Sequence, residues 1–316
     1  MNILITGAAG FIGSHLCEAL IGKHRVFGLD NFCDFYDPGI KWNNIKTLQK
    51  NDNFILFETD IRDEKRLGSI FSGNKFDLVI HLAAMAGVRP SIKNPKLYTE
   101  VNINGTVNLL EQCKKYGIKN FIFASSSSVY GNNKKIPFSE ADPVDFPISP
   151  YASTKKVGEL ICHTHFHLYG MSVLCLRLFT VYGPRQRPDL AIYKFARLML
   201  DEKAIPVYGD GTTQRDYTYV DDIIDGILKA IEFVQTGHHY EIFNLGESQT
   251  ITLNRMIETL EKALGIKAKR EFLSMQLGDV ERTYADISKS KKMLGYDPQT
   301  DFGDGIAKFV EWIKCN

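Results

Sequence analysis

The sequence lacks both a strong charge imbalance and a long apolar run. Its 38 lysines and arginines nearly balance 37 aspartates and glutamates, which gives a formal net charge of +1. This balance provides no sequence-wide electrostatic reason to bind nucleic acid or a membrane surface. No uncharged apolar run approaches the roughly 20 residues that span a bilayer, and no basic segment precedes an apolar core near residue 1. We therefore expect a soluble, cytoplasmic protein whose partner is a small molecule, with no nucleic-acid or membrane partner.

Paired cysteines and a complete set of metal ligands are also missing. The six cysteines are dispersed without a Cys-x-x-Cys pair, and most lie in apolar contexts typical of small buried thiols. This usage indicates a reducing compartment. Among His163, His165 and His167, only the first and last would share a helix face, and no nearby carboxylate or cysteine completes a ligand set. We expect no metal.

What the sequence does contain is enough apolar material for a sizeable core, 44% of 316 residues. Residues 2–6 form a short apolar strand pattern, followed by glycines at 7, 10 and 13 and then a helical pattern. Gly7 and Gly10 permit a tight turn and a close approach of backbone to a pyrophosphate, while Gly13 lets the helix pack on the sheet. This arrangement is typical of a dinucleotide-binding turn.

An acidic residue follows at the place where such a turn needs one. A second strand pattern, residues 25–29, ends at Asp30, which follows Gly13 by 17 residues. A carboxylate at this place accepts hydrogen bonds from a ribose diol and repels a 2′-phosphate. The sequence therefore favours NAD over NADP.

Strand-like and helix-like segments keep alternating as far as Leu178. The strand patterns cover residues 54–57, 78–81, 121–124 and 173–178, and the helical patterns cover 64–71, 95–116 and a segment that starts near Tyr151. This alternation is typical of a doubly wound parallel sheet, which binds ligands at the carboxyl ends of its strands. Asp60 could therefore bind an adenine amine, and the small Ala83 and Ala84 would let a flat cofactor pass.

The alternation weakens after Leu178, which predicts a second, smaller lobe. Short strands are expected around Val207 and over 217–220, 242–245 and 270–273, with helices over 190–200, 221–234 and 252–264. We expect residues 1–178 to form mainly the NAD-binding domain and residues 179–316 mainly the substrate lobe, with the chain crossing between them. No linker, repeat or low-complexity segment separates the lobes, so the site should lie between them.

Arginines are prominent in the second half. Arg185, Arg187, Arg215 and Arg282 suit an anionic substrate, because the guanidinium fork matches phosphate and carboxylate geometry. For each of them taken alone, a solvated surface charge is an equally good interpretation.

A phenol and an ammonium lie four residues apart at a predicted helix start. Pro150 suits the first helical position, because a proline there loses no hydrogen bond that the helix needs. Residues four apart share a helix face, so Tyr151 and Lys155 could approach the same ligand, and the lysine cation would favour ionisation of the phenol. Since Tyr-x-x-x-Lys is common by chance, the other motifs have to decide its meaning.

Taken together, these motifs resemble the extended short-chain dehydrogenase/reductase family, and specifically its nucleotide-sugar epimerases. The resemblance runs from end to end and is carried by residues 7–13, Asp30, Asp60, residues 82–84, residues 125–131 and the Tyr151–Lys155 pair. It implies an α/β fold, a Rossmann-type doubly wound parallel sheet with a smaller α/β C-terminal substrate lobe. It also implies bound NAD and a homodimer paired through the helix of 94–116 and the helix after Tyr151.

The same resemblance implies a mechanism. Tyr151, its pKa lowered by Lys155 and by the nicotinamide cation, takes the proton from the sugar 4-hydroxyl while hydride passes from C4 to NAD. The resulting 4-keto sugar turns over and accepts the hydride on its other face. Ser126 hydrogen-bonds the reacting oxygen, with Ser127 and Ser128 as helpers.

The resemblance also assigns the contacts. Cofactor contacts fall on Gly7, Gly10, Phe11, Ile12, Gly13, Asp30, Asn31, Asp60, Ile61, Leu82, Ala83, Ala84, Arg89, Asn102, Tyr151, Lys155 and Phe179. Substrate contacts fall on Ser127, Ser128, Thr180, Arg187, Val207, Tyr208, Arg215, Asp279 and Arg282.

Within this family, residues 86–89, 125–131, 179–184, 187–189 and 278–280 are most similar to members that convert UDP-glucuronate to UDP-galacturonate. Related dehydratases and decarboxylases place an acid after the equivalent of Ser126 or Ser127, and none stands here. Thr180 occupies a position where UDP-glucose epimerases usually have asparagine, whereas Met85 departs from the glutamine common in glucuronate epimerases. A UDP-glucose or UDP-N-acetylglucosamine 4-epimerase and a UDP-glucuronate decarboxylase remain alternatives. A non-enzymatic NAD-sensing regulator would typically lack Tyr151 or Lys155.

Overall fold

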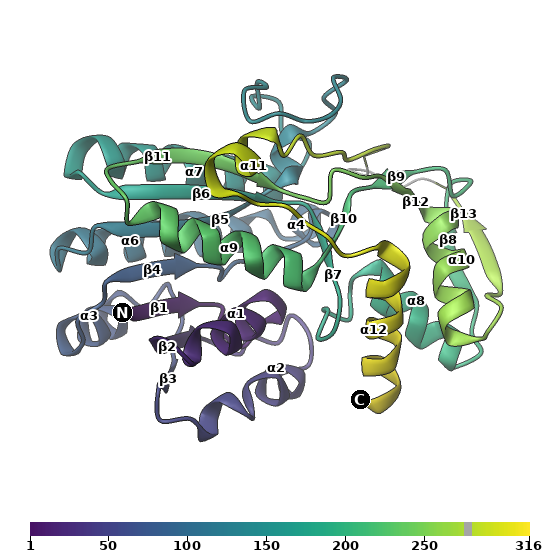
Figure 1. The fold of residues 1–316 in the computed structure, drawn as a ribbon, viewed down its shortest axis with the longest axis horizontal. Coiled ribbons are helices and arrows are strands. Elements are labelled where there is room, and N and C mark those ends of the chain that lie inside the picture. Colours follow the sequence, from purple (N-terminus) through teal and green to yellow (C-terminus); the bar gives the residue numbers. More distant parts are fainter. Residues whose placement is uncertain (275–279) are drawn as a thin grey trace.

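A computed structural model describes residues 1–274 and 280–316 of the chain. Its centre is a seven-stranded sheet in the order β11-β6-β5-β4-β1-β2-β3, in which every neighbouring pair is parallel (Figure 1). The strands are β1 (Asn2–Thr6), β2 (Arg25–Asp30), β3 (Phe54–Glu58), β4 (Leu78–His81), β5 (Asn120–Ser126), β6 (Ser172–Leu178) and β11 (Tyr240–Leu245). The predicted doubly wound parallel sheet is confirmed.

The central strands are mostly apolar on both of their faces because helices cover both faces of the sheet. Successive side chains of a strand point to opposite faces. Ile3 and Ile5 accordingly belong to one core layer, while Leu4 between them belongs to the other. All three side chains are fully buried, as expected of a parallel sheet between two layers of helices.

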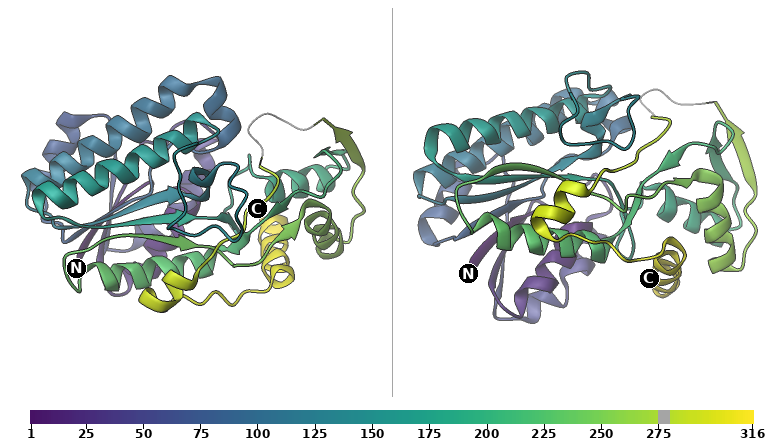
Figure 2. Two further views of the ribbon diagram at one scale, coloured as in Figure 1. Left: turned by 90° about the horizontal axis from the view of Figure 1, so that it is seen from above. Right: turned by 45° about the horizontal axis from the view of Figure 1, so that its top comes forward.

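Helices form a layer on each face. One layer contains α1 (Phe11–Ile21) and α9 (Val220–Val234), which contribute to the same core as Ile3 and Ile5. The other contains α3 (Glu64–Gly73), α6 (Gly105–Lys115) and α7 (Pro150–Tyr169), which pack around Leu4. Figure 2 shows the sheet between the two layers, with α6 and α7 side by side.

The smaller lobe lies beyond the carboxyl ends of the strands, at the right of Figure 1. Its helices are α8 (Ala191–Leu200), α10 (Leu253–Leu264) and α12 (Phe302–Cys315), and α10 packs against the other two. Its strand pairs are β8 (Ile205–Tyr208) with β13 (Arg270–Leu273), β7 (Thr180–Tyr182) with β10 (Tyr217–Tyr219), and β9 (Gln214–Arg215) with β12 (Ile251–Thr252).

One strand predicted for the smaller lobe belongs to the main sheet instead. The predicted strand 242–245 is part of β11, which pairs along its length with β6, from Tyr240 opposite Val173 to Leu245 opposite Leu178. Placing it in the smaller lobe was wrong, because a buried apolar run does not reveal the strand with which it pairs. The chain therefore crosses back into the first lobe, and a lobe boundary at residue 178 stays a prediction.

The remaining elements are short and mostly unpredicted. The helix predicted over 95–116 is divided into α5 (Pro95–Thr99), a π turn η2 (Glu100–Asn104) and α6. Additional helices are α2 (Pro38–Ile45), α4 (Val88–Lys93) and α11 (Ser288–Leu294), together with the 3₁₀ segments η1 (Leu48–Lys50) and η3 (Ser127–Tyr130). In the part of the chain that the structure describes, no helix has the length and apolarity needed to cross a membrane.

Candidate active site

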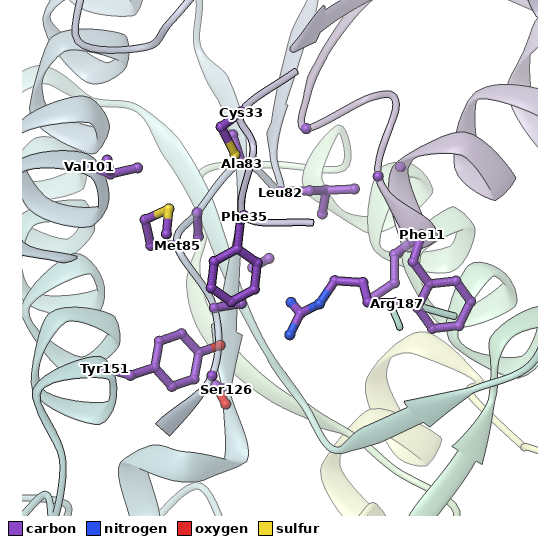
Figure 3. A pocket seen from close by; sticks show the side chains of 18 of the residues that line it. Phe11, Cys33, Phe35, Leu82, Ala83, Met85, Val101, Ser126, Tyr151 and Arg187 are labelled. Atoms are coloured by element: carbon purple, nitrogen blue, oxygen red, sulfur yellow. The ribbon is translucent and has the colours of Figure 1, made fainter. Parts of the chain in front are cut away.

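A cavity of about 680 Å³ lies at the carboxyl ends of the central strands and extends to the smaller lobe (Figure 3). It brings together most of the residues that the sequence assigns to cofactor or substrate. Its lining includes Gly7, Gly10, Phe11, Ile12, Gly13, Asp30, Asn31, Asp60, Ile61, Leu82, Ala83, Ala84, Ser126, Ser127, Ser128, Tyr151, Lys155, Phe179, Thr180 and Arg187.

The glycine turn between β1 and α1 has no room for side chains. Gly7 has a φ of 71°, and a Cβ on it would lie 2.8 Å from the Ala83 backbone nitrogen. A Cβ on Gly13 would lie 2.1 Å from the Gly7 carbonyl oxygen. Among the residues that the structure describes, no side chain caps the first turn of α1, so its backbone N–H groups can bind a pyrophosphate. The turn therefore fits a dinucleotide.

Asp30 is buried at the end of β2 and held in a fixed orientation. Its two carboxylate oxygens accept hydrogen bonds from the backbone nitrogens of Phe32 (2.9 Å) and Ala9 (3.2 Å). The Lys41 ammonium lies 3.6 Å from the same carboxylate. The carboxylate is thus placed to meet a ribose diol, with a cation beside it that the sequence did not predict.

Asp60 is equally well ordered at the end of β3. The Arg62 guanidinium donates two hydrogen bonds to it (3.0 and 2.8 Å), the Arg62 backbone nitrogen a third (2.8 Å), and the Asn31 amide a fourth (2.8 Å). Burial acts to raise the pKa of Asp60, but the hydrogen bonds from Arg62 and Asn31 outweigh it and lower the pKa to about 2. Asp60 is therefore an anionic acceptor across the working pH range.

Helix α7 begins as the sequence predicts. Ser149 is its N-cap and accepts a hydrogen bond from the Ala152 nitrogen (3.1 Å), and Pro150 occupies the first turn. Tyr151 and Lys155 then lie one turn apart, and both line the cavity. The Lys155 ammonium donates to the Ala124 carbonyl (2.7 Å) and lies 6.0 Å from the centre of the Tyr151 ring.

Burial dominates the electrostatics of this pair. Burial raises the pKa of Tyr151, and only a hydrogen bond with Ser126 and the charge of Arg187 oppose it. The Lys155 ammonium donates instead to the Ala124 carbonyl. The prediction that Lys155 and the nicotinamide cation together lower the pKa of Tyr151 concerns the site with its cofactor and stays a prediction. Burial also lowers the pKa of Lys155, to about 8.

The serines after β5 form a small donor array. The Ser128 hydroxyl donates to the Ser126 hydroxyl oxygen (3.0 Å), and the Ser128 backbone nitrogen donates to it as well (3.2 Å). With its oxygen already accepting, the Ser126 hydroxyl can donate its own proton, and its partner in the structure is Tyr151. In Figure 3 the Tyr151 hydroxyl points toward Ser126, so a reacting oxygen placed between them would meet both.

Arg187 enters the cavity from the loop after β7, and its guanidinium points toward the centre (Figure 3). One edge forms a paired contact with Asp189, at 3.0 and 2.8 Å. Burial acts to lower the pKa of Arg187, but Asp189 outweighs it and raises the pKa. The arginine is therefore a permanent cation that faces Tyr151 across the cavity.

Several predicted contact residues do not line this cavity. Asn102 is buried and uses its amide on both backbone groups of Met85 and on Thr154, so it holds the cavity wall in place. The Arg89 guanidinium packs over the Tyr208 ring, 4.6 Å from its centre, which joins the two halves of the chain.

The remaining predicted substrate residues lie further into the smaller lobe. Val207 is fully buried in β8. Arg215 donates to the Gln214 carbonyl (2.8 Å), and Gln214 forms a β-bridge with Arg282. Asp279 lies outside the described residues.

Sequence reasoning missed a group of cavity residues that follows β2. Phe35, Tyr36 and Lys41 all line the cavity. Their only signal was position, since a segment directly after a strand of a doubly wound sheet lies at the ligand-binding edge.

The three histidines of α7 have ordinary partners. His165 contacts the Ile161 carbonyl (3.0 Å) and Glu111 (3.3 Å), while the rings of His163 and His167 stack with centres 6.5 Å apart. Among the described residues, no three histidine, cysteine or acidic side chains are grouped as metal ligands.

Comparison with known proteins gives a consistent result. The family model described as GDP-mannose 4,6 dehydratase matches residues 4–309. A UDP-glucuronate 4-epimerase of Thermodesulfobacterium geofontis is 44% identical over 315 residues, which cover 99% of this chain and 96% of the relative. UDP-glucuronate 4-epimerase 3 of Arabidopsis thaliana is 45% identical over 329 residues, covering 98% of this chain and 76% of the relative.

Solved structures show the same likeness. The crystal structure of UDP-glucuronic acid 4-epimerase from Bacillus cereus, in complex with UDP-glucuronic acid and NAD, superimposes with a TM-score of 0.94. The two chains are 40% identical, and the match covers 100% of this chain and 99% of the other.

Proposed function

The chain belongs to the family described as GDP-mannose 4,6 dehydratase, within the short-chain dehydrogenase/reductases, and from that premise we propose that it is an NAD-dependent UDP-sugar 4-epimerase. It interconverts UDP-glucuronate and UDP-galacturonate through a transient 4-keto sugar. One observation carries this function: a serine, a tyrosine and a lysine stand at one side of a cavity whose other side presents an arginine. Relatives with this activity match along nearly the whole chain.

The residues present fit NAD. The glycine turn and the open first turn of α1 suit the pyrophosphate, Asp30 suits the adenosine ribose, and Asp60 suits the adenine amine. When bound, NAD accepts a hydride from C4 of the sugar and returns it to the opposite face, so no net oxidation occurs. The crystal structure of the Bacillus cereus relative contains NAD.

Side chains of the protein transfer the proton of the sugar 4-hydroxyl. Tyr151 accepts the proton of the sugar 4-hydroxyl and returns it after the ring has turned. Ser126, oriented by Ser128, holds the same oxygen through its hydroxyl hydrogen. The Lys155 cation, whose pKa is about 8, is charged near neutral pH, and its charge would favour the Tyr151 phenolate, which is the form that can accept this proton.

The substrate assignment rests on the far side of the cavity. Arg187 provides a charge-assisted contact for a sugar carboxylate, and Thr180 provides a hydroxyl. Ser127 and Ser128 provide no acid or base near the sugar, which disfavours elimination or decarboxylation as the outcome. One observation favours the alternative of a UDP-glucose 4-epimerase. Asp189 already pairs with Arg187, so the arginine has less need of a carboxylate on the sugar.

A panel of UDP-sugars incubated with the purified protein and followed by NMR tests the function. We expect UDP-glucuronate to equilibrate with UDP-galacturonate without added reductant. An Arg187→Ala variant should impair UDP-glucuronate far more than UDP-glucose. A wild-type protein that prefers UDP-glucose would overturn the substrate assignment, and release of a pentose nucleotide would show decarboxylation instead.

Assembly and location remain proposals. A homodimer paired through α6 and α7 is supported by the outer face of α7, where Leu160 and Leu168 are 54% and 59% exposed. A cytoplasmic location is supported by the six cysteines, all of which are free thiols. The near-zero net charge supports a protein without nucleic-acid or membrane partners.

A further inference from the structure

The segment between β2 and α2, residues 31–37, reaches over the cavity and is fixed at both ends. At its start, the Phe32 ring stacks on Trp42 with centres 3.8 Å apart and planes 3° apart, although Phe32 has a φ of 48°. At its end, the Asp37 carboxylate caps α2 by accepting from the Gly39 nitrogen (2.8 Å). The tip therefore presents Phe35 and Tyr36 to the cavity.

Phe35 faces the cation that the proposed function assigns to the sugar. The central carbon of the Arg187 guanidinium lies 5.6 Å from the centre of the Phe35 ring, within the range of a cation–π contact. In Figure 3 the Phe35 ring lies near both Tyr151 and the guanidinium. An aromatic residue from the segment between β2 and α2 thus contacts an arginine from the loop after β7.

The other supports of Arg187 hold its backbone and one edge. Arg185 pairs with Glu18 of α1 (2.8 Å), and His15 of the same helix contacts the Pro184 carbonyl (3.0 Å). These contacts fasten the loop to the cofactor lobe. Asp189 binds one edge of the guanidinium. The Phe35 ring contacts the flat face of the same guanidinium and so fixes the orientation of that face.

We propose that Phe35 is a positioning residue that sets the substrate preference of the site, an inference that rests on the function proposed above. The ring holds the Arg187 guanidinium ready for a carboxylate at C6 of the sugar. A flexible arginine would have to be ordered at each binding event, and pre-ordering it strengthens binding of the charged sugar. A sugar without the carboxylate gains nothing from this pre-ordering, so Phe35 discriminates between the two.

Phe35→Leu tests the proposal, because leucine keeps an apolar side chain but has no ring. Dissociation constants for UDP-glucuronate and UDP-glucose are measured by calorimetry on the NAD-loaded protein. In Phe35→Leu we expect the preference for UDP-glucuronate to fall about three- to thirtyfold, the range of a cation–π contact. Phe35→Tyr, which keeps the ring, should retain the preference.

Phe57→Leu is the matched control. Phe57 is an aromatic side chain of β3 that stacks on Phe27 and does not line the cavity, so its loss should leave the preference unchanged. If Phe35→Leu weakened the binding of both sugar nucleotides equally, Phe35 would only line the cavity, and the proposal would be overturned. An unchanged preference would overturn it as well. Thermal unfolding of each variant shows whether the fold is intact.

A double-mutant cycle shows whether Phe35 acts through Arg187. In an Arg187→Ala background, Phe35→Leu should cause no further loss of preference. Additive losses would contradict the inference. If the wild type does not discriminate between the two sugars, the proposed substrate fails and the inference fails with it. A discriminating wild type whose preference survives Phe35→Leu contradicts the inference alone.

Discussion

At the scale of single residues, the protonation of His81 can be derived from its neighbours. Thr106 donates its hydroxyl proton to the Asn102 carbonyl (2.6 Å), so at His81 Nε2 (2.9 Å) it can only accept. Thr6 accepts from the Ala83 nitrogen (3.2 Å) and donates to His81 Nδ1 (2.8 Å). His81 is therefore neutral with its proton on Nε2, and this chain of bonds fixes Ala83 in the cavity wall.

This neutrality predicts a loss of stability in acid. Burial and the Lys155 charge lower the pKa of His81 to about 3, whereas the pKa of a histidine in the unfolded chain is about 6.5. Between these values the unfolded chain binds one more proton at this residue, so the free energy of unfolding falls as pH drops below about 6.5, by about 1.4 kcal/mol per pH unit. Urea unfolding of wild type and His81→Gln near pH 7 and pH 5 measures the effect. Parallel losses in the two proteins would contradict it.

The general base gives the most direct residue test. Tyr151→Phe keeps the ring and removes only the hydroxyl that Ser126 faces. Loss of one positioned acid–base group costs about 10²- to 10⁴-fold in rate, while the affinity for the UDP-sugar should change little. NMR turnover and calorimetric binding separate these two effects. Turnover at the wild-type rate would remove Tyr151 from the mechanism.

Residues whose role follows from local geometry could be predicted from the sequence. Gly7 and Gly13 were identified because only glycine fits their turn, and Pro150 because it suits a first helical turn. Phe35 was not predicted, because its contact with Arg187 joins two loops far apart in the chain. The raised pKa of Tyr151 in the cofactor-free chain was not predicted either, because burial is not visible in a motif.

At the scale of elements, one face of α7 provides one cavity residue and two contacts with β5. Tyr151, Lys155 and Glu159 are spaced four apart and so lie on one face. Tyr151 reaches the cavity and Lys155 binds the Ala124 carbonyl. Glu159 accepts a hydrogen bond from Ser125 (2.7 Å). The helix thereby fixes the end of β5, whose last residue is Ser126.

Glu159 also forms a buried ion pair with Arg177, at 2.8 and 2.9 Å, and both side chains are at most 1% exposed. Glu159→Gln should destabilise the fold by about 3–5 kcal/mol, because it leaves a buried cation without its partner. Replacing both residues, as in Glu159→Gln with Arg177→Met, should recover much of that loss. Urea denaturation measures each variant. A double variant no more stable than Glu159→Gln would show that the unpaired charge is not the cause.

Strand β11 shows the limit of prediction for elements. Its apolar pattern indicated a strand, but its partner β6 precedes it by about sixty residues, and no local signal links the two. As the edge of the sheet, it is protected by side chains rather than by another strand. Lys289 donates to the Ile242 carbonyl (2.8 Å), and Glu140 accepts from the Asn244 nitrogen (2.7 Å). Such coverage prevents pairing with another chain at this edge.

At the scale of the whole molecule, the cavity exists because the two lobes are fastened to each other around it. The Arg185–Glu18 pair and the Arg89–Tyr208 contact both join the two halves of the sequence. Strand β11 and helix α9 return the chain to the first lobe. Neither lobe alone would place Arg187 opposite Tyr151, so catalysis as proposed requires the intact chain.

We expect the outer face of α7 to be buried in an interface with a second copy of the chain. Leu160 and Leu168 are eight residues apart, so they lie on one helix face, and both are more than half exposed. A two-fold interface would pair α6 and α7 with their counterparts and cover these leucines. Leu160→Glu with Leu168→Glu places four carboxylates in that interface, so we expect a dimeric wild type and a monomeric variant by light scattering at micromolar concentration. Lys262→Glu, at an exposed position of α10 in the smaller lobe, makes the same change in charge away from α6 and α7 and is the matched comparison. A monomeric wild type would contradict the assembly, and a variant that stays dimeric would place the interface on another face.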